Sequence, residues 1–193
     1  MPGYQAIVLA AGAGQRYGGG KLLADWRGEP LVRAAVRTAL GAPVDEVLVV
    51  LGHQADEVAS ALSPLADRRL RLLTAAGWAE GLAASLRAGV GGLPAGSRGF
   101  LLFLADMPTI PAELPRQVVE GLEGGAAAVR PIYGETPAHP VGFSARFYED
   151  LLRLKGDAGA GALLRGRADI LRLETSDAGA IFDVDYPGAT PPP

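Results

Sequence analysis

The stretch Ile7-Val8-Leu9-Ala10-Ala11-Gly12-Ala13-Gly14-Gln15-Arg16-Tyr17-Gly18-Gly19-Gly20-Lys21 decides the fold of this chain. It opens with an apolar run that is typical of a strand buried on both faces of a parallel sheet. The run gives way to a loop with five glycines in nine positions, closed by Lys21. Glycine reaches positive φ and has no side chain to block a ligand, so several backbone N–H groups can point at one anion. The stretch therefore predicts a strand and a phosphate-binding loop, and the simpler interpretation is a mobile turn.

Two well-known phosphate loops do not fit this stretch. A Walker A loop needs Ser or Thr at position 22, where this chain has Leu22. The dinucleotide-binding fingerprint begins well with Gly12 and Gly14, but Tyr17 stands where its third small residue belongs. The loop is therefore of a third kind.

Outside this stretch, apolar runs alternate with helical patterns. Strands are expected at 46–51, 70–74, 100–105, 127–132, 170–174 and 181–184, an extended segment at 137–143, and helices at 30–40, 54–62, 81–90, 111–122, 145–154 and 157–164. Arg68, Arg69 and Arg71 favour a place near a sheet edge for the strand at 70–74. Because such alternation implies right-handed crossovers between parallel strands, we predict an α/β fold. Its core is a single doubly wound, mostly parallel, Rossmann-like sheet with helices on both faces.

Composition limits the class of protein. A chain of 193 residues with 49% hydrophobic and 20% charged residues is expected to be globular, with one domain over residues 1–187 and a disordered tail at 188–193. The net charge of −3 offers no basic surface to a nucleic acid. The absence of cysteine excludes disulfides and thiol chemistry. Since no basic leader and no apolar run of about 18 residues is present, we expect a cytoplasmic protein without membrane segments.

Carboxylates follow two of the predicted strands. The apolar run at 100–105 leads into Asp106, at the same sheet edge as the glycine loop, where a carboxylate can hold a divalent cation beside phosphates. Asp183 and Asp185 alternate along the late predicted strand, so their side chains share a face. The alternatives are a turn-capping role for Asp106 and plain surface positions for the other two.

The glycine loop resembles the signature of the nucleotidyltransferases of the molybdenum-cofactor group, a MobA/MocA-like NTP transferase family that reads L-A-A-G-x-[GS]-x-R-x-G-x-x-K. The matching residues are Leu9, Ala10, Ala11, Gly12, Gly14, Arg16, Gly18 and Lys21. In that family the loop holds the triphosphate of CTP or GTP, with the Arg and Lys on its oxygens. The cytidylyl branch usually reads L-A-A-G and the guanylyl branch L-A-G-G, so the resemblance implies CTP.

Four other segments resemble elements of the same family. Asp106-Met107-Pro108 matches D-[MQ]-P, and 183–187 matches a late D-[IV]-D-x-P element with Tyr186 in place of the usual Thr. Segment 76–86 resembles N-x-x-x-x-G-L-x-x-S-L, which lies against the base, with Ala76 in place of Asn. His139 to Phe143 resembles [GR]-H-P-V-x-F, which borders the pocket of the second substrate. Segment 156–161 follows G-D-x-G-A-R, except that Gly161 replaces an Arg expected near the phosphate of that substrate.

The resemblance thereby assigns roles to particular residues. Arg16, Lys21 and Asp106 are assigned to catalysis, and Asp106 with Asp185, preferred narrowly over Asp183, to Mg²⁺, with Mn²⁺ as the alternative ion. The nucleotide is assigned to Ala10, Ala11, Gly12, Gly14, Arg16, Lys21, Gly81 and Ser85, and the second substrate to His139 and Asp157.

What the resemblance implies is a cytidylyltransferase of the same α/β fold. It would transfer CMP from CTP to the phosphate of molybdopterin-bound molybdenum cofactor and release pyrophosphate, with a client molybdoenzyme as a further partner. One alternative is an enzyme of this fold that uses GTP or a sugar or alcohol phosphate. The other is a non-catalytic nucleotide-binding protein that hands a cofactor to a partner.

Overall fold

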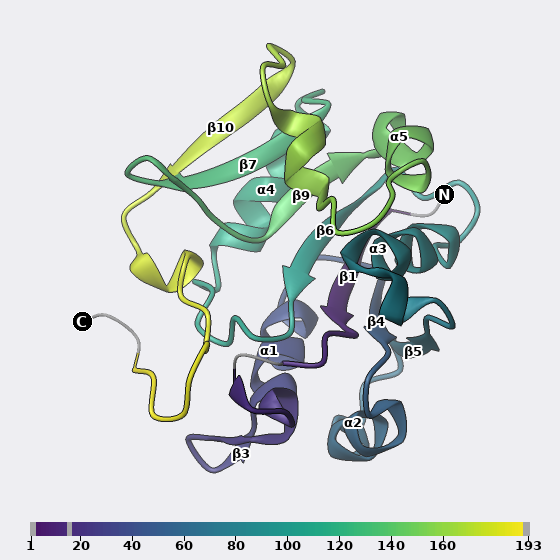
Figure 1. Cartoon of the computed structure of the whole chain (residues 1–193). Helices are drawn as coiled ribbons and strands as arrows, with labels where there is room; N and C mark the ends of the chain where they lie inside the picture. Colours follow the sequence, from purple (N-terminus) through teal and green to yellow (C-terminus); the bar gives the residue numbers. More distant parts are fainter. Residues whose placement is uncertain (1–2, 15–16, 191–193) are drawn as a thin grey trace.

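The computed structural model describes residues 3–14 and 17–190, and an eight-stranded sheet forms the centre of the fold. Its strands are β1 (Tyr4–Ala10), β4 (Glu46–Leu51), β5 (Leu70–Thr74), β6 (Gly99–Leu104), β7 (Ala128–Tyr133), β8 (Thr136–Pro137), β9 (Val141–Ser144) and β10 (Ile170–Thr175). The order across the sheet is β10-β7-β9-β6-β1-β4-β5, and β8 pairs with β7 (Figure 1). β9 runs antiparallel to β6 and β7, and β8 antiparallel to β7, while the remaining pairs are parallel. The sheet is therefore mostly parallel, as the sequence predicts.

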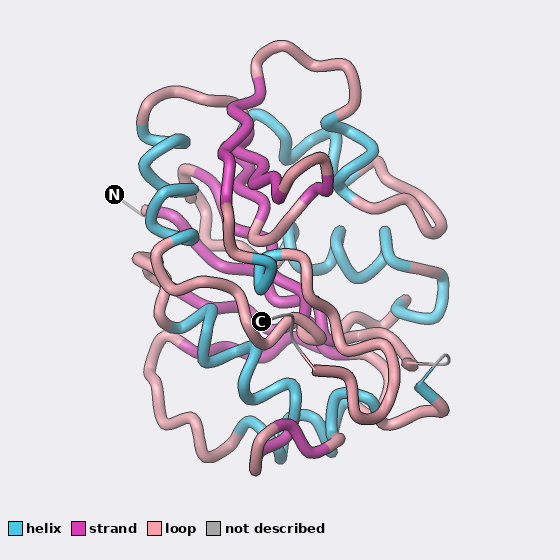
Figure 2. Tube along the Cα trace, turned by 90° about the vertical axis from the view of Figure 1, so that its left-hand side faces the viewer, coloured by secondary structure: helices cyan, strands magenta, loops and turns pink. Residues whose placement is uncertain are grey.

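Helices cover both faces of this sheet (Figure 2). They are α1 (Leu31–Leu40), α2 (Ala55–Leu62), α3 (Leu82–Gly91), α4 (Leu114–Glu123) and α5 (Tyr148–Leu152), with the short 3₁₀ helices η2 (Lys21–Leu23), η3 (Trp78–Glu80), η4 (Ala145–Phe147), η5 (Ala160–Leu164) and η6 (Ala178–Ala180). On one face α1, α2 and α4 pack through a core that includes Val36, Val58 and Val118. On the other face α3 and α5 pack through Leu86 and Leu151. The predicted doubly wound arrangement is confirmed.

The central strand β1 shows why its sequence is apolar throughout. Val8 belongs to the core on the α1 side and Ile7 to the core on the α3 side, and both side chains are fully buried. A central parallel strand has helices over both faces, so it needs apolar residues in both directions. Because β1 pairs in parallel with β4 and β6, the carboxyl ends of all three strands reach the edge at which the glycine loop begins.

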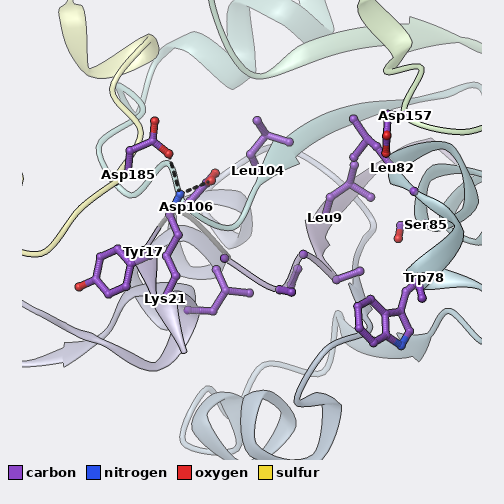
Figure 3. A pocket seen from close by; sticks show the side chains of 18 residues that line it. Leu9, Tyr17, Lys21, Trp78, Leu82, Ser85, Leu104, Asp106, Asp157 and Asp185 are labelled. Carbon is purple, nitrogen blue, oxygen red and sulfur yellow. Dashed lines mark hydrogen bonds and ion pairs between the residues drawn. The ribbon is translucent and has the colours of Figure 1, made fainter. Parts of the chain in front are cut away.

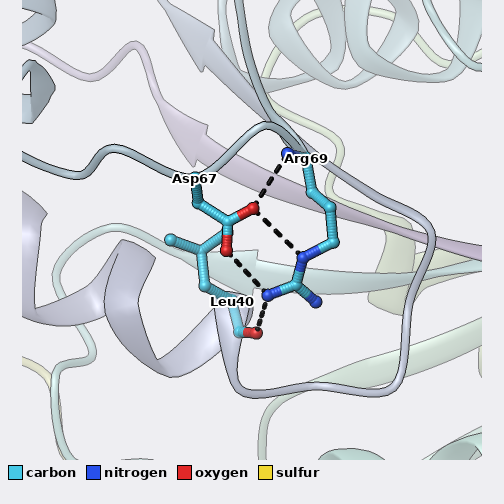
Figure 4. A network of polar contacts seen from close by, with 3 residues as sticks. All are labelled: Leu40, Asp67 and Arg69. Carbon is cyan, nitrogen blue, oxygen red and sulfur yellow. Dashed lines mark hydrogen bonds and ion pairs between the residues drawn. The ribbon is translucent and has the colours of Figure 1, made fainter.

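Strand β5 forms one edge of the sheet, as the neighbouring arginines predict. Arg69 Nη2 donates to the carbonyl oxygen of Leu40 at the end of α1, at 2.8 Å, and to Asp67 Oδ2, also at 2.8 Å. The backbone N–H and Nε of Arg69 both donate to Asp67 Oδ1 (Figure 4). This network ties the turn before β5 to α1 and belongs to the framework of the fold.

The strand predicted at 181–184 is wrong, because this segment forms a turn followed by coil. Val184 instead packs with Leu31 in a small third core, and the rings of Trp26 and Phe182 lie 5.7 Å apart beside it. Trp26 belongs to a two-stranded hairpin outside the main sheet, formed by β2 (Asp25–Trp26) and β3 (Glu29–Pro30). The apolar residues of the late segment are therefore buried against α1 and this hairpin, and they add no strand to the sheet.

Three predicted helices are shorter than the sequence indicates. The helix expected at 111–122 begins only at Leu114, with Pro115 in its first turn, where proline is tolerated. The helix expected at 145–154 is η4 followed by α5, and the one expected at 157–164 is the 3₁₀ helix η5. Glycines at 156, 159 and 161 account for the last difference, since glycine disfavours the α-helix.

The tail predicted at 188–193 belongs only in part to the described residues. Residues 191–193 of the predicted tail lie outside the described residues, while Ala189 is buried in the small core with Leu31 and Val184. Over residues 3–14 and 17–190, no helix is both long and apolar enough to cross a membrane.

Candidate active site

A pocket of about 580 Å³ opens at the carboxyl ends of β1 and β6 (Figure 3). Five parts of the chain line it: β1 with the glycine loop, η3 with the start of α3, the end of β6, and two later loops at Asp157 and Asp185. The lining residues are Leu9, Ala10, Ala11, Gly12, Ala13, Gly14, Tyr17, Lys21, Leu22, Trp78, Ala79, Gly81, Leu82, Ser85, Leu104, Asp106, Asp157 and Asp185. The pocket thus lies where ligands bind in open α/β sheets.

Lys21 lies between two carboxylates at one end of this pocket. Its Nζ donates to Asp106 Oδ2 at 2.8 Å and to Asp185 Oδ1 at 3.2 Å, and its side chain is only 10% exposed. Burial lowers the pKa of Lys21, but the hydrogen bonds and negative charges of the two carboxylates outweigh burial, so the net pKa is raised. The amine is therefore a fixed positive charge at neutral pH, in contact with two oxygen ligands of a kind that metal ions also use.

Glycine at position 14 allows the loop to place this lysine. Gly14 has a φ of +59°, and a Cβ built on it would lie 2.8 Å from the Cβ of Lys21. Both the left-handed conformation and the close approach therefore require glycine. The loop folds back on itself here, since the backbone N–H of Tyr17 donates to the Gly14 carbonyl oxygen.

The two carboxylates come from distant parts of the chain. Asp106 directly follows β6, and the N–H of Ala105 still donates to the Leu9 carbonyl oxygen, which fixes this strand end beside β1. Asp185 stands in the late coil. The N–H of Val184 donates to the Asp106 carbonyl oxygen at 3.0 Å and so connects this coil to the residue that follows β6. This bond and the packing of Val184 against Leu31 hold the late segment at the edge of the sheet.

Asp183 is not among the residues that line the pocket. Desolvation, followed by the negative charges of Asp185 and Asp106, raises the pKa of its carboxyl group. Of the two late carboxylates, Asp185 is the one that contacts Lys21.

The opposite end of the pocket is mainly apolar. It is formed by Trp78 and Leu82, the buried hydroxyl of Ser85, and Asp157 (Figure 3). Gly81 has a φ of +119°, and a Cβ built on it would lie 2.6 Å from Asp157 Oδ1. Glycine therefore lets the segment at 156–157 close against the start of α3, where the Ala83 N–H donates to the Gly156 carbonyl oxygen.

Trp78 is a pocket residue that the sequence analysis missed. A Cβ built on Gly52 would lie 2.7 Å from Trp78 and equally close to the Cβ of Ala11, so the indole packs tightly against the ends of β1 and β4. Its ring centroid lies 5.5 Å from that of His53. The signal in the sequence is an aromatic residue three positions before Gly81, but only the fold shows that it faces the pocket.

The structure brings most of the predicted site residues into this one pocket. Those that line it are Ala10, Ala11, Gly12, Gly14, Lys21, Gly81, Ser85, Asp106, Asp157 and Asp185. Arg16 lies outside the described residues. In the part of the chain that the structure describes, no group of three or more His, Cys, Asp or Glu side chains could hold a metal ion by itself. An ion at Asp106 and Asp185 would therefore need further oxygen ligands, which phosphates and water supply.

His139 does not line this pocket, so the two residues predicted for the second substrate do not share it. Its ring Nδ1 lies 3.3 Å from the Leu102 carbonyl oxygen, and its backbone N–H donates to the Ala180 carbonyl oxygen. Burial lowers the pKa of His139; the Leu102 carbonyl and the charge of Asp106 raise it by less, and the charge of Arg130 lowers it. The ring is therefore neutral near pH 7 and lies within the electric field of both charges.

The family profile of the MobA-like NTP transferase domain matches residues 6–174 of this chain. Among curated relatives, the purine catabolism protein PucB of Bacillus subtilis (strain 168) is 31% identical over 191 residues, which cover 94% of this chain and 91% of PucB. Nicotine blue oxidoreductase of Paenarthrobacter nicotinovorans is 30% identical, with 96% and 93% covered. The molybdenum cofactor cytidylyltransferase of Escherichia coli (strain K12) is 24% identical, with 97% and 93% covered.

Solved structures show the same fold. Rv0371c of Mycobacterium tuberculosis H37Rv superposes with a TM-score of 0.82 and 27% identity, over 96% of this chain and 94% of that one. A complex of Rv0371c with manganese gives a TM-score of 0.74, 25% identity and coverages of 89% and 88%. The nucleotidyl transferase Mth528 of Methanothermobacter gives 0.79, 26% identity and coverages of 95% and 92%. The similarity thus extends over the whole pocket-bearing sheet.

Proposed function

Because the chain belongs to the MobA-like NTP transferase family and is a nucleotidyltransferase, we propose that it transfers CMP from CTP to the phosphate of a molybdopterin-type cofactor and releases pyrophosphate. One observation carries this proposal above the others. A glycine loop and a lysine held by two carboxylates lie at one end of the pocket, and a pocket wall of small and apolar side chains lies at the other. The first end suits a triphosphate and the second a base.

The reaction is a displacement at the α-phosphorus of CTP. An oxygen of the acceptor phosphate forms a bond to that phosphorus, and the bond to the leaving pyrophosphate breaks on the opposite side. No covalent step on the protein is needed, so the protein contributes by aligning the groups and by neutralising charge. In our proposal Lys21 neutralises the charge of the phosphates, because its flexible side chain can turn from the carboxylates to a phosphate oxygen. Arg16 assists in this neutralisation.

Asp106 and Asp185 would hold Mg²⁺ or Mn²⁺. The fit is supported by Lys21, whose ammonium group takes the place of a cation between the two carboxylates. The manganese complex of the relative Rv0371c supports a divalent ion in this fold. When bound, the ion supplies positive charge to the phosphate oxygens that surround the reacting phosphorus.

The base would lie at the apolar end. In our proposal Ser85 offers its hydroxyl to the edge of the base, and Gly81 leaves the backbone open to it. Ala11 lines the pocket, and its Cβ and Trp78 lie on either side of Gly52, so in our proposal the Ala11 methyl group limits the space for the base. A narrow floor favours cytosine over the larger guanine, which supports CTP as the substrate.

The test is a pyrophosphate-release assay with the purified chain, Mg²⁺, the molybdopterin-type acceptor and each of the four nucleoside triphosphates in turn. We expect release with CTP that depends on the acceptor, and formation of the cytosine dinucleotide product by mass spectrometry. If none of the four triphosphates gives release of pyrophosphate, the proposal is overturned. If CTP releases pyrophosphate only when a sugar phosphate or an alcohol phosphate replaces the cofactor, the proposed acceptor is wrong and the proposed nucleotide stands.

A further inference from the structure

The sheet has two edge strands, β5 and β10, each with a neighbouring strand on one side only. An edge strand can pair with a strand of another molecule unless the chain protects it. At β5 and the turn before it, Arg69 forms an ion pair with Asp67, and Arg71 forms one with Glu46. The arginines at this edge are therefore neutralised within the chain.

At the other edge, both the backbone and the charged side chains of β10 lack partners (Figure 1). Within the described residues, the backbone of β10 is hydrogen-bonded to that of β7 and to no other segment. Arg172 and Glu174 are exposed, and neither forms an ion pair with a residue that the structure describes. The residue opposite Arg172 on β7 is Arg130, and like charges at directly opposed positions destabilise a sheet. A carboxylate from another molecule would offset this repulsion.

The side chains of β10 divide between the two faces of the sheet. Leu171 and Leu173 face α4: a Cβ built on Gly121 of α4 would lie 2.8 Å from Leu171 Cδ2, and Leu173 packs against the core on that side. Arg172 and Glu174 lie on the opposite face, because successive side chains of a strand alternate. Leu171 is nevertheless 44% exposed. The edge therefore has a partly covered apolar strip on one face, and a cation and an anion on the other.

The order of these charges makes the edge complementary to itself. When two copies related by a two-fold axis pair their β10 strands, the strands are antiparallel, and the axis passes between the same residue of both strands. With the axis at Arg172 or at Glu174, like charges lie opposite each other. With the axis at Leu173, Arg172 of each copy lies opposite Glu174 of the other, and opposite charges at such positions stabilise a sheet. The charges therefore favour the register centred on Leu173.

We propose that this protein forms a dimer in which β10 pairs with β10 of a second copy, in the register centred on Leu173. The second strand supplies hydrogen bonds to the free backbone groups of the edge. On the α4 face, Leu171 comes to lie beside Leu173 and Thr175 of the second copy, which cover its exposed surface. The inference does not depend on the proposed function, because β7 and β9 lie between this edge and the pocket at the ends of β1 and β6.

Charge reversal tests both the edge and the register. Sedimentation equilibrium over a wide range of protein concentration measures the dissociation constant of the dimer. In Arg172→Glu only carboxylates meet at the paired edges, and in Glu174→Arg only guanidinium groups meet, so each variant should dimerise at least about tenfold more weakly than the parent. The double variant Arg172→Glu/Glu174→Arg exchanges the two charges and should recover the dissociation constant of the parent within about threefold.

A mixture of the two single variants gives a readout that a merely structural role would not move. In the mixed dimer every glutamate of one chain lies opposite an arginine of the other, so the mixed dimer should form more readily than either variant pairs with itself. Native mass spectrometry distinguishes the species by mass. Both residues are exposed, so the variants should fold, and circular dichroism checks this. The control Arg68→Glu makes the same change of charge at an exposed position next to β5, and it should leave the dimer unchanged.

Three results would overturn the proposal. The first is a parent that stays monomeric at the highest concentration. The second is a dimer whose dissociation constant neither single variant changes, because the two copies then meet at another surface. The third is weakening by the single variants without recovery in the double variant and in the mixture. A lack of pyrophosphate release in the transfer assay would overturn the proposed function and leave the dimer standing.

Discussion

The two ends of the pocket are built on different physical principles. At the carboxylate end, Lys21 is held by two hydrogen bonds to Asp106 and Asp185, and the loop around it is shaped by glycine. At the apolar end, Trp78 and Leu82 form the wall by packing, and among the lining side chains that the structure describes, only Lys21, Asp106 and Asp185 form ion pairs, at the other end. One end therefore depends on particular charged atoms and the other on the shape of the space.

This difference sets the size of the effects that mutations should have. Removal of a preorganised charge next to a reacting phosphate removes a large electrostatic stabilisation of the transition state. A methyl group in a pocket wall changes the fit by only about 1–3 kcal/mol. We therefore expect large losses at the carboxylate end and graded changes in specificity at the apolar end.

The largest effect is expected from Asp106→Asn. The amide keeps the shape of the carboxylate but loses the charge that would hold the cation, so kcat/KM should fall below about a thousandth of the parent value. Steady-state pyrophosphate release at increasing Mg²⁺ and Mn²⁺ checks this, with Tm expected to stay within about 3 °C of the parent. Asp183→Asn is the control, since Asp183 does not line the pocket, and it should keep at least about a third of the activity. If neither ion affects the rate of either protein, no metal is held there.

The next largest effect is expected from Lys21→Ala. Loss of one fixed charge on the phosphates costs about 3–4 kcal/mol at the transition state, so kcat/KM should fall about a hundred- to a thousandfold. The chain provides a matched control in Lys155→Ala, because Lys155 is its only other lysine and is exposed. A Lys21 variant that stays within about threefold of the parent would contradict the idea that this end depends on particular atoms.

At the apolar end, Ala11→Gly should relax the choice of base. The parent is expected to prefer CTP over GTP by about ten- to two-hundredfold, which is what one methyl-sized obstacle is worth. Removal of the Ala11 methyl opens the floor beside Trp78 and should shift the ratio toward GTP. Competition between both nucleotides in one assay measures the ratio, and Ala13→Gly, in the same loop, controls for added backbone freedom. A parent that uses both nucleotides equally well would show that Ala11 does not set the choice.

The sequence predicted the parts of the molecule that are encoded locally. The strand and loop at 7–21 follow from an apolar run and from glycine spacing, and the position of Asp106 follows from its place after an apolar strand. The same reasoning failed at 181–184, because Val184 and its neighbours have the alternation of a strand but are buried against α1. Asp185 reaches Lys21 through contacts between distant segments, which are the packing of Val184 against Leu31 and the backbone hydrogen bond from Val184 to Asp106, and no local pattern encodes them.

Contacts between distant segments were also beyond the sequence. Trp78 can lie at the pocket because Gly52, which directly follows β4, has no side chain in its place. Arg130 and Arg172 meet through the register of β7 and β10, which are separated in the chain by β8, β9 and the three helical segments η4, α5 and η5. The resemblance supplied roles for the specified positions of its motifs, whereas Trp78 stands at an unspecified position of one motif and Arg130 and Arg172 lie outside the motifs.

The smallest effect is expected in the pH dependence of stability and concerns the surroundings of the carboxylate end. Burial holds the pKa of His139 below its ordinary value. The hydrogen bond with the Leu102 carbonyl and the charge of Asp106 raise this pKa by less, and the charge of Arg130 lowers it further. A lowered pKa means that the unfolded chain binds a proton more readily than the folded one. The stabilising contribution is therefore complete above about pH 6.5 and is lost as the pH falls below it. Replacement of the ring by an amide in His139→Gln should remove this loss, so that Tm falls about 2–4 °C less between pH 7 and pH 5.5 than in the parent. Equal slopes in the parent and in His139→Gln would show that His139 takes up its proton as readily in the folded chain as in the unfolded one, and that burial does not lower its pKa.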